Sequence, residues 1–152
     1  MKLEQYIKEE QIIISSDNLP TKKEILEQLS NLLAQATGYD AEKMRKAVEH
    51  RESLMSTGIG HGLAVPHVRL EGLASPAVAL GVYPSGIQDY VSLDDEPIRI
   101  VLLIAAPKGQ HETYIRLLAS AVEILKQPAR RNVILAAKDS KTLAAILTEE
   151  KA

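Results

Sequence analysis

Two of the four histidines stand in settings that suit a reactive imidazole. His67 follows Leu63-Ala64-Val65-Pro66, in which the proline fixes its own φ and favours an extended residue before it. We therefore expect His67 at the end of a short strand, on stiff backbone. His111 is expected at the start of a helix, where free amides and a positive field favour a neutral ring and a nearby anion. A neutral imidazole can attack phosphorus and leave again, since its nitrogen changes charge near neutral pH.

Three glycines, Gly58, Gly60 and Gly62, alternate just before this stretch. Glycines at this density predict a tight turn or a close approach to the backbone. Their spacing matches neither a dinucleotide-binding fingerprint nor a Walker loop. The amides of Gly60, His61 and Gly62 are expected to stabilise a phosphoryl group, together with Arg51. By spacing alone, a generic small-ligand site is the stronger interpretation.

Length and composition set limits on the class of protein. The chain of 152 residues, with 18 basic and 20 acidic side chains, predicts one domain over 1–152 and neither a nucleic-acid surface nor a polybasic membrane patch. The lack of cysteine excludes disulfides and thiol chemistry. The start of the chain lacks the apolar core of a signal peptide. The longest apolar run, Ile100 to Pro107, is far short of the ~20 residues that cross a bilayer, so we expect a cytoplasmic protein.

Periodicity predicts the elements that position these residues. Strands are expected at Ile12–Ile14, at Ala77–Tyr83 (ended by Pro84-Ser85-Gly86) and at Ile100–Ala106, with a turn at Ser15–Asn18 and a loop carrying a weak strand at Gln88–Glu96. Helices are expected from the Thr21–Glu24 capping box to about Gly38, from Asp40 to about His50, from His111 through Leu125, from Pro128, and from Ser140 or Lys141. His111 is expected on the inward face that carries Tyr114 and Leu118. The pattern predicts a single α/β domain with a mixed sheet and helices on both faces.

The residues at these positions resemble a known family. Arg51-Glu52, Ser56-Thr57-Gly58-Ile59-Gly60, Leu63-Ala64-Val65-Pro66-His67, Pro97 to Pro107, and His111 followed by Leu117-Leu118-Ala119 are similar to the fructose/mannitol-type enzyme IIA domain of the bacterial phosphoenolpyruvate-dependent phosphotransferase system. The nitrogen-regulatory enzyme IIA subgroup is the most similar. The resemblance covers nearly the whole chain and implies the mixed α/β sandwich of that family.

The resemblance also implies roles. His67 would accept a phosphoryl group from the carrier protein HPr or its nitrogen-branch paralogue. His111 would hydrogen-bond the phosphoryl group, and Arg51 would screen its charge and help to orient partners. The acceptor would be a IIB domain, with no metal or organic cofactor, or the phosphoryl group would remain as a signal.

Several alternatives stay open beside the phosphoryl carrier. The chain could be a regulatory module whose partners depend on phosphorylation. It could also be a IIA-like fold that has lost phosphotransfer, because Val68 stands where the family has a small residue and His61 where it often has Asn or Glu. Finally, His61, His67 and His111 could form a three-histidine metal site with an open position.

Overall fold

The computed structural model describes residues 3–15 and 20–149 and contains one mixed sheet. Its strands are β1 (Ile12–Ile14), β2 (Gly58–Gly60), β3 (Leu63–Ala64), β4 (His67–Leu70), β5 (Ala77–Ile87) and β6 (Ile98–Pro107). They lie in the order β1-β5-β6-β3-β2, with β4 also paired to β6. β6 runs parallel to β3 and β4 and antiparallel to β5, while β1 is parallel to β5. The mixed sheet expected from the sequence is confirmed.

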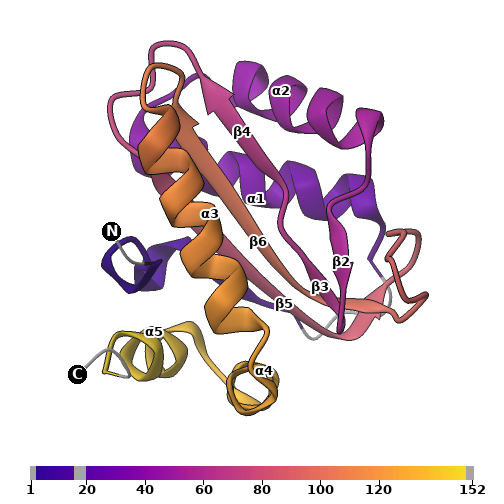
Figure 1. Ribbon diagram of the computed structural model, residues 1–152. Coiled ribbons are helices and arrows are strands. Elements are labelled where there is room, and N and C mark those ends of the chain that lie inside the picture. Colours follow the sequence, from indigo (N-terminus) through magenta and orange to yellow (C-terminus); the bar gives the residue numbers. More distant parts are fainter. Residues whose placement is uncertain (1–2, 16–19, 150–152) are drawn as a thin grey trace.

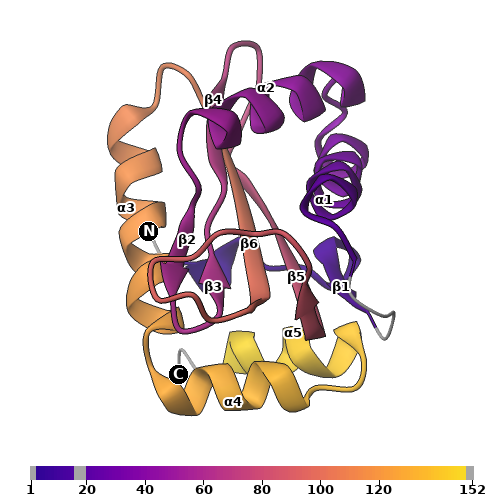
Figure 2. The same cartoon turned by 90° about the vertical axis from the view of Figure 1, so that its right-hand side faces the viewer.

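Helices cover both faces of this sheet (Figures 1 and 2). The α-helices are α1 (Lys22–Thr37), α2 (Ala41–Leu54), α3 (His111–Leu125), α4 (Pro128–Ala136) and α5 (Ser140–Glu149), and two short 3-10 helices, η1 (Leu3–Gln5) and η2 (Glu9–Gln11), precede β1. In Figure 2, α1 and α2 lie on one side of the sheet and α3 on the other, with α4 and α5 across the lower end. No helix in the described ranges is long and apolar enough to cross a membrane.

The central strand β6 supplies side chains to two separate cores. Val101, Leu103 and Ala105 belong to the core under α1 and α2. Ile100, Leu102 and Ile104 alternate with them and pack in the core that contains α3, α4 and α5 residues. Successive side chains of a strand point to opposite faces, so a strand covered on both sides needs an unbroken apolar run. This confirms the sequence-based expectation for Ile100–Ala106.

Most predicted helix boundaries are confirmed by their caps. Thr21 and Glu24 form the expected capping box, and Gly38 ends α1 with a left-handed φ of 77°. Asp40 caps α2 by accepting from the Lys43 amide. The predicted end of α2 near His50 is wrong, because α2 continues to Leu54. Arg51 and Glu52 are therefore helical.

Three strand predictions need correction. His67 opens β4 instead of ending a strand, since Pro66 interrupts the ladder along β6 between β3 and β4. β5 continues to Ile87 beyond Pro84, with an irregular register that absorbs the proline. Residues 88–97 contain no strand. Of the predicted turn at 15–18, residues 16–18 lie outside the described residues.

Candidate active site around His67

The His67 ring is oriented by the backbone just before it. Its Nδ1 lies 2.6 Å from the carbonyl oxygen of Val65. A carbonyl only accepts, so Nδ1–H donates and the neutral ring keeps its lone pair on Nε2. The residue is half-buried, and this burial lowers the pKa of His67 below its ordinary value of 6.5, with the Arg51 charge acting in the same direction and the Val65 bond and Glu52 opposing it. The site therefore holds an unprotonated nucleophilic nitrogen near neutral pH.

Arg51 reaches His67 from the last turn of α2. One guanidinium nitrogen lies 3.5 Å from His67 Nε2 and another donates to the Met55 carbonyl at 3.2 Å. The extension of α2 past His50 makes this contact possible. It places a permanent cation at the only ring nitrogen that is free to react.

The next residue, Glu52, fixes the end of α2. Its side chain is buried, and its two carboxylate oxygens accept from the amide and the hydroxyl of Thr57, both at 2.8 Å. Lys22 forms an ion pair with it at 3.1 Å, and Tyr90 hydrogen-bonds Thr57 at 2.8 Å. This network ties α2 to the entry of β2 and so holds the neighbouring arginine in place.

His111 lies on the other side of the site and is paired with Arg69. A guanidinium nitrogen of Arg69 lies 3.1 Å from His111 Nδ1. Arginine only donates, so Nδ1 accepts and the neutral ring carries its proton on Nε2. The ring of Tyr114 lies near both histidines, with centroid distances of 5.6 Å to His67 and 6.3 Å to His111. The two imidazoles thus present complementary groups, a lone pair on one and an N–H donor on the other.

The expectation that His111 faces inward is wrong: it is exposed. It belongs to the first turn of α3, beyond the loop that follows β6, and it lies against Tyr114 at the rim of the site.

A pocket of about 340 Å³ opens beside His67 and is strongly cationic. Arg51, Arg69 and Lys108 contribute permanent positive charges, and no Asp or Glu in the described part of the chain lines it. The full lining is Ala47, His50, Arg51, Leu54, His67, Val68, Arg69, Lys108 and Tyr114. A pocket with this charge and a nucleophile at its wall suits an anionic group such as a phosphoryl.

The glycine turn does not lie at this site. Gly62 accepts from the amides of Arg99 and Ile100, whereas His67 is level with Ile104 on the same strand, a separation of ~15 Å at about 3.3 Å per residue. The turn is held by Asp94, which accepts from the His61 amide at 2.9 Å. We therefore withdraw Gly60, His61 and Gly62 as phosphoryl-stabilising residues.

The three-histidine metal site does not form either. In the described ranges no three His, Cys, Asp or Glu side chains are grouped to hold a metal ion. His61 is exposed, with a left-handed φ of 59°, at the distant turn. Val68 is 6% exposed and packs in the core under α1 and α2, so this departure from the family forms a wall of the pocket and not its mouth.

Arg69 and Tyr114 were missed as site residues by sequence reasoning. The signal for Arg69 was present, because residues two apart on a strand share a face and it follows His67 by two. Tyr114 was assigned to the core of α3. It is buried, yet its ring lies near both imidazoles.

Comparison with known proteins agrees with this geometry. Residues 5–150 match the family described as "Phosphoenolpyruvate-dependent sugar phosphotransferase system, EIIA 2". The chain belongs to this family. It is 31% identical over 135 residues to the nitrogen regulatory protein of Pseudomonas aeruginosa, covering 87% of each protein. It is also 31% identical over 129 residues to the PTS system fructose-specific EIIABC component of Bacillus subtilis, covering 84% of this chain but 20% of that protein.

Solved EIIA structures show the same fold. The nitrogen regulatory protein IIA-Ntr from Neisseria meningitidis superposes with a TM-score of 0.84 at 20% identity, covering 96% of this chain and 99% of that one. The mannitol enzyme IIA of Escherichia coli, solved as a complex with phosphorylated enzyme IIB, gives a TM-score of 0.74 at 24% identity, covering 95% and 97% of the two chains. The single-domain sandwich is thus the EIIA fold.

Proposed function

We propose that the protein is a cytoplasmic phosphoryl carrier that accepts a phosphoryl group on Nε2 of His67. The observation that carries this proposal is the donation of Nδ1–H to the Val65 carbonyl at 2.6 Å, which leaves Nε2 unprotonated toward a cationic pocket. Membership in the EIIA 2 family supports it. The proposed donor is HPr or its nitrogen-branch paralogue, and the proposed acceptor is a IIB domain.

The proposed reaction uses the side chains around the His67 pocket. The Nε2 lone pair of His67 attacks the phosphorus of a donor phosphohistidine in line, so that the new N–P bond forms as the donor N–P bond breaks and the donor imidazole leaves. The transferring group carries its charge on three equatorial oxygens. Arg51 and Arg69 offer N–H donors and positive charge to these oxygens, and His111 offers its Nε2–H. Val65 keeps its hydrogen bond throughout, which holds the ring in position.

A regulatory role is the second candidate, and the homologues named nitrogen regulatory proteins favour it. A phosphoryl group on His67 would place a dianion in the cationic pocket. It would neutralise part of a surface that otherwise attracts acidic partners, and so change which partners bind. Both roles need the same phosphohistidine.

Purified protein incubated with phosphoenolpyruvate, enzyme I and each of the two carrier paralogues tests the proposal by intact mass. We expect the mass of one phosphoryl group to be added with at least one carrier, and no addition in His67→Gln. A competent carrier that leaves the wild-type mass unchanged contradicts the proposal. Subsequent transfer to a IIB domain distinguishes a transport component from a regulator.

A further inference from the structure

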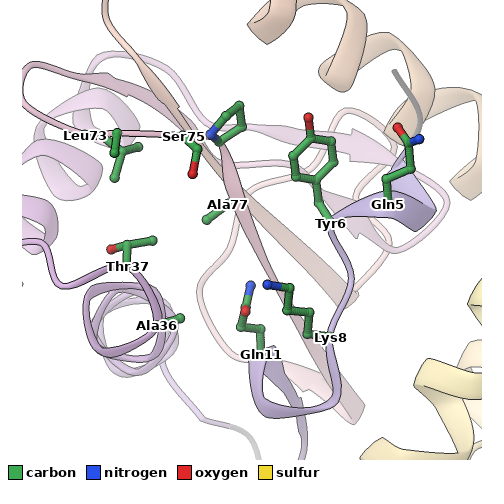
Figure 3. Close-up of a pocket in the computed structure, with 11 residues that line it drawn as sticks. Gln5, Tyr6, Lys8, Gln11, Ala36, Thr37, Leu73, Ser75 and Ala77 are labelled. Atoms are coloured by element: carbon green, nitrogen blue, oxygen red, sulfur yellow. The ribbon is translucent and has the colours of Figure 1, made fainter.

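A second cavity lies away from His67, between the N-terminal segment and the start of β5 (Figure 3). Its volume of about 350 Å³ falls in the range of ~300–1,000 Å³ typical of small-molecule sites. The lining includes Lys8, Gln11, Leu73, Ser75, Pro76 and Ala77. None of them lines the His67 pocket, so the proposed phosphoryl transfer does not involve this cavity.

Gln11 gives the cavity a fixed polar wall. Its side chain is 6% exposed and its Nε2 donates to the Val78 carbonyl at 2.7 Å. This bond ties the segment before β1 to β5 and sets the orientation of the amide. An amide has a second N–H and a carbonyl oxygen, and in the described part of the chain neither has another partner. The carbonyl oxygen is not sealed from solvent, so a polar ligand in the cavity would replace water at it.

Lys8 gives the cavity a single net charge. Among the residues that the structure describes, no Asp or Glu lines the cavity and Lys8 makes no ion pair. In Figure 3 the side chains of Lys8 and Gln11 both extend from the N-terminal segment toward Ala77. Two nitrogen donors directed at the same space, one of them an ammonium, favour one carboxylate over a neutral or doubly charged group.

The remaining lining residues indicate the chemical character of the rest of the ligand. Ser75 makes no hydrogen bond with the described residues, and its hydroxyl lies on the wall opposite Lys8 (Figure 3). Leu73 and Pro76 add apolar side chains to the lining. Hydroxyl groups on a short carbon chain match this mixture of neutral hydrogen-bonding groups and small apolar surfaces.

We propose that this cavity is a binding site for a small hydroxylated monocarboxylate, with its carboxylate on Lys8 and Gln11 and its hydroxyl groups toward Ser75. The ligand bridges the N-terminal segment and the loop that leads from β4 into β5. β4 begins with His67, so an occupied site stabilises the segments next to the strand that carries the nucleophile.

Three six-carbon probes that differ chiefly in charge test the proposal: gluconate with one carboxylate, sorbitol with none and glucarate with two. Each is titrated into the 152-residue protein and followed by amide NMR shifts. We expect gluconate to shift Gln11, Ser75 and Ala77, sorbitol to bind at least tenfold more weakly, and glucarate to bind no more tightly than gluconate.

Two matched variants locate the charge. Lys8→Gln removes the ammonium but keeps a hydrogen-bonding side chain, and should weaken gluconate binding about tenfold or more. Lys141→Gln, on an exposed position of α5, changes the net charge equally and should leave binding unchanged. Both variants should accept a phosphoryl group at the wild-type rate, which separates this test from the test of His67. No localised shift with gluconate, or equal weakening by both variants, overturns the proposal.

Discussion

The Nδ1 atom of His67 lies 2.6 Å from the carbonyl oxygen of Val65, two residues earlier in the same chain. The intervening Pro66 has a fixed φ, so this contact is set by local backbone and not by a distant partner. It decides which ring nitrogen can react. The short link between β3 and β4 therefore sets the tautomer of the nucleophile.

On the acid side, the rate of phosphoryl acceptance should fall at a pH below the usual pKa range of histidine. Burial and Arg51 lower the pKa of His67, so the neutral ring predominates at pH 6.5, where an ordinary histidine is half protonated. Acceptance should thus persist at pH 6.5 and fall only as the pH drops through the lowered pKa. NMR titration of the His67 ring, beside the pH profile of the rate, checks this. A titration midpoint above 6.5 contradicts it.

Replacing Arg51 by Gln should slow acceptance and raise the pKa of His67. The slowing follows from losing a charge-assisted hydrogen bond to the phosphoryl oxygens, worth ~1.5–3 kcal/mol, which corresponds to about tenfold or more in rate. The pKa rises because a nearby positive charge no longer disfavours the protonated ring. Arg45→Gln is the control, since Arg45 lies on the same helix and pairs with Glu42 and Glu49. An effect of equal size in the control assigns the loss to α2 stability.

Arg69 and His111 should act as one unit. Each single Ala variant removes the 3.1 Å contact between them, so the double variant should be little worse than the more damaging single one. For this double-mutant cycle, the rates of phosphoryl acceptance from the carrier and of onward transfer are measured in each variant. Onward transfer should be affected more than acceptance. Arg116→Ala, which loses an exposed pair with Glu112 on the same helix, should change neither rate. Additive effects of Arg69→Ala and His111→Ala would refute the coupling.

Gly81 should tolerate no side chain. A Cβ at this position would lie 2.3 Å from the hydroxyl oxygen of the buried Tyr83, whose ring crosses the backbone of β5 there. Gly81→Ala is expected to lower the free energy of unfolding by about 1–3 kcal/mol, as overpacking does in cores. Urea denaturation measures this. Gly109→Ala, where a Cβ meets nothing within 4 Å, should stay within ~0.5 kcal/mol of wild type.

Local signals predicted much of this fold. The capping box at Thr21, the left-handed cap at Gly38 and the unbroken apolar run of β6 each depend on residues close together in sequence, and each is confirmed. The same holds for the proline at the start of α4. Such features need no knowledge of tertiary contacts.

The pairing register of the strands along β6 could not be predicted from the sequence. The turn at Gly60–Gly62 is five residues from His67 along the chain, and only its pairing with the start of β6 shows that it lies at a distance. The pairing of Arg69 with His111 likewise requires that β4 and the first turn of α3 meet at one end of β6. The glycine turn was predicted to lie at the site because it is close to His67 in sequence. The pairing of Arg69 with His111 could not be predicted in this way, because the two residues are far apart in sequence.

The most direct test of the central claim is the position of the phosphoryl group on the ring. Protein labelled with ¹⁵N in histidine is phosphorylated through phosphoenolpyruvate, enzyme I and a carrier, and long-range ¹H–¹⁵N spectra are recorded. We predict a phosphoryl group on Nε2 of His67, with Nδ1 still protonated and bonded to Val65. Attachment to Nδ1, or to another histidine, would contradict the account.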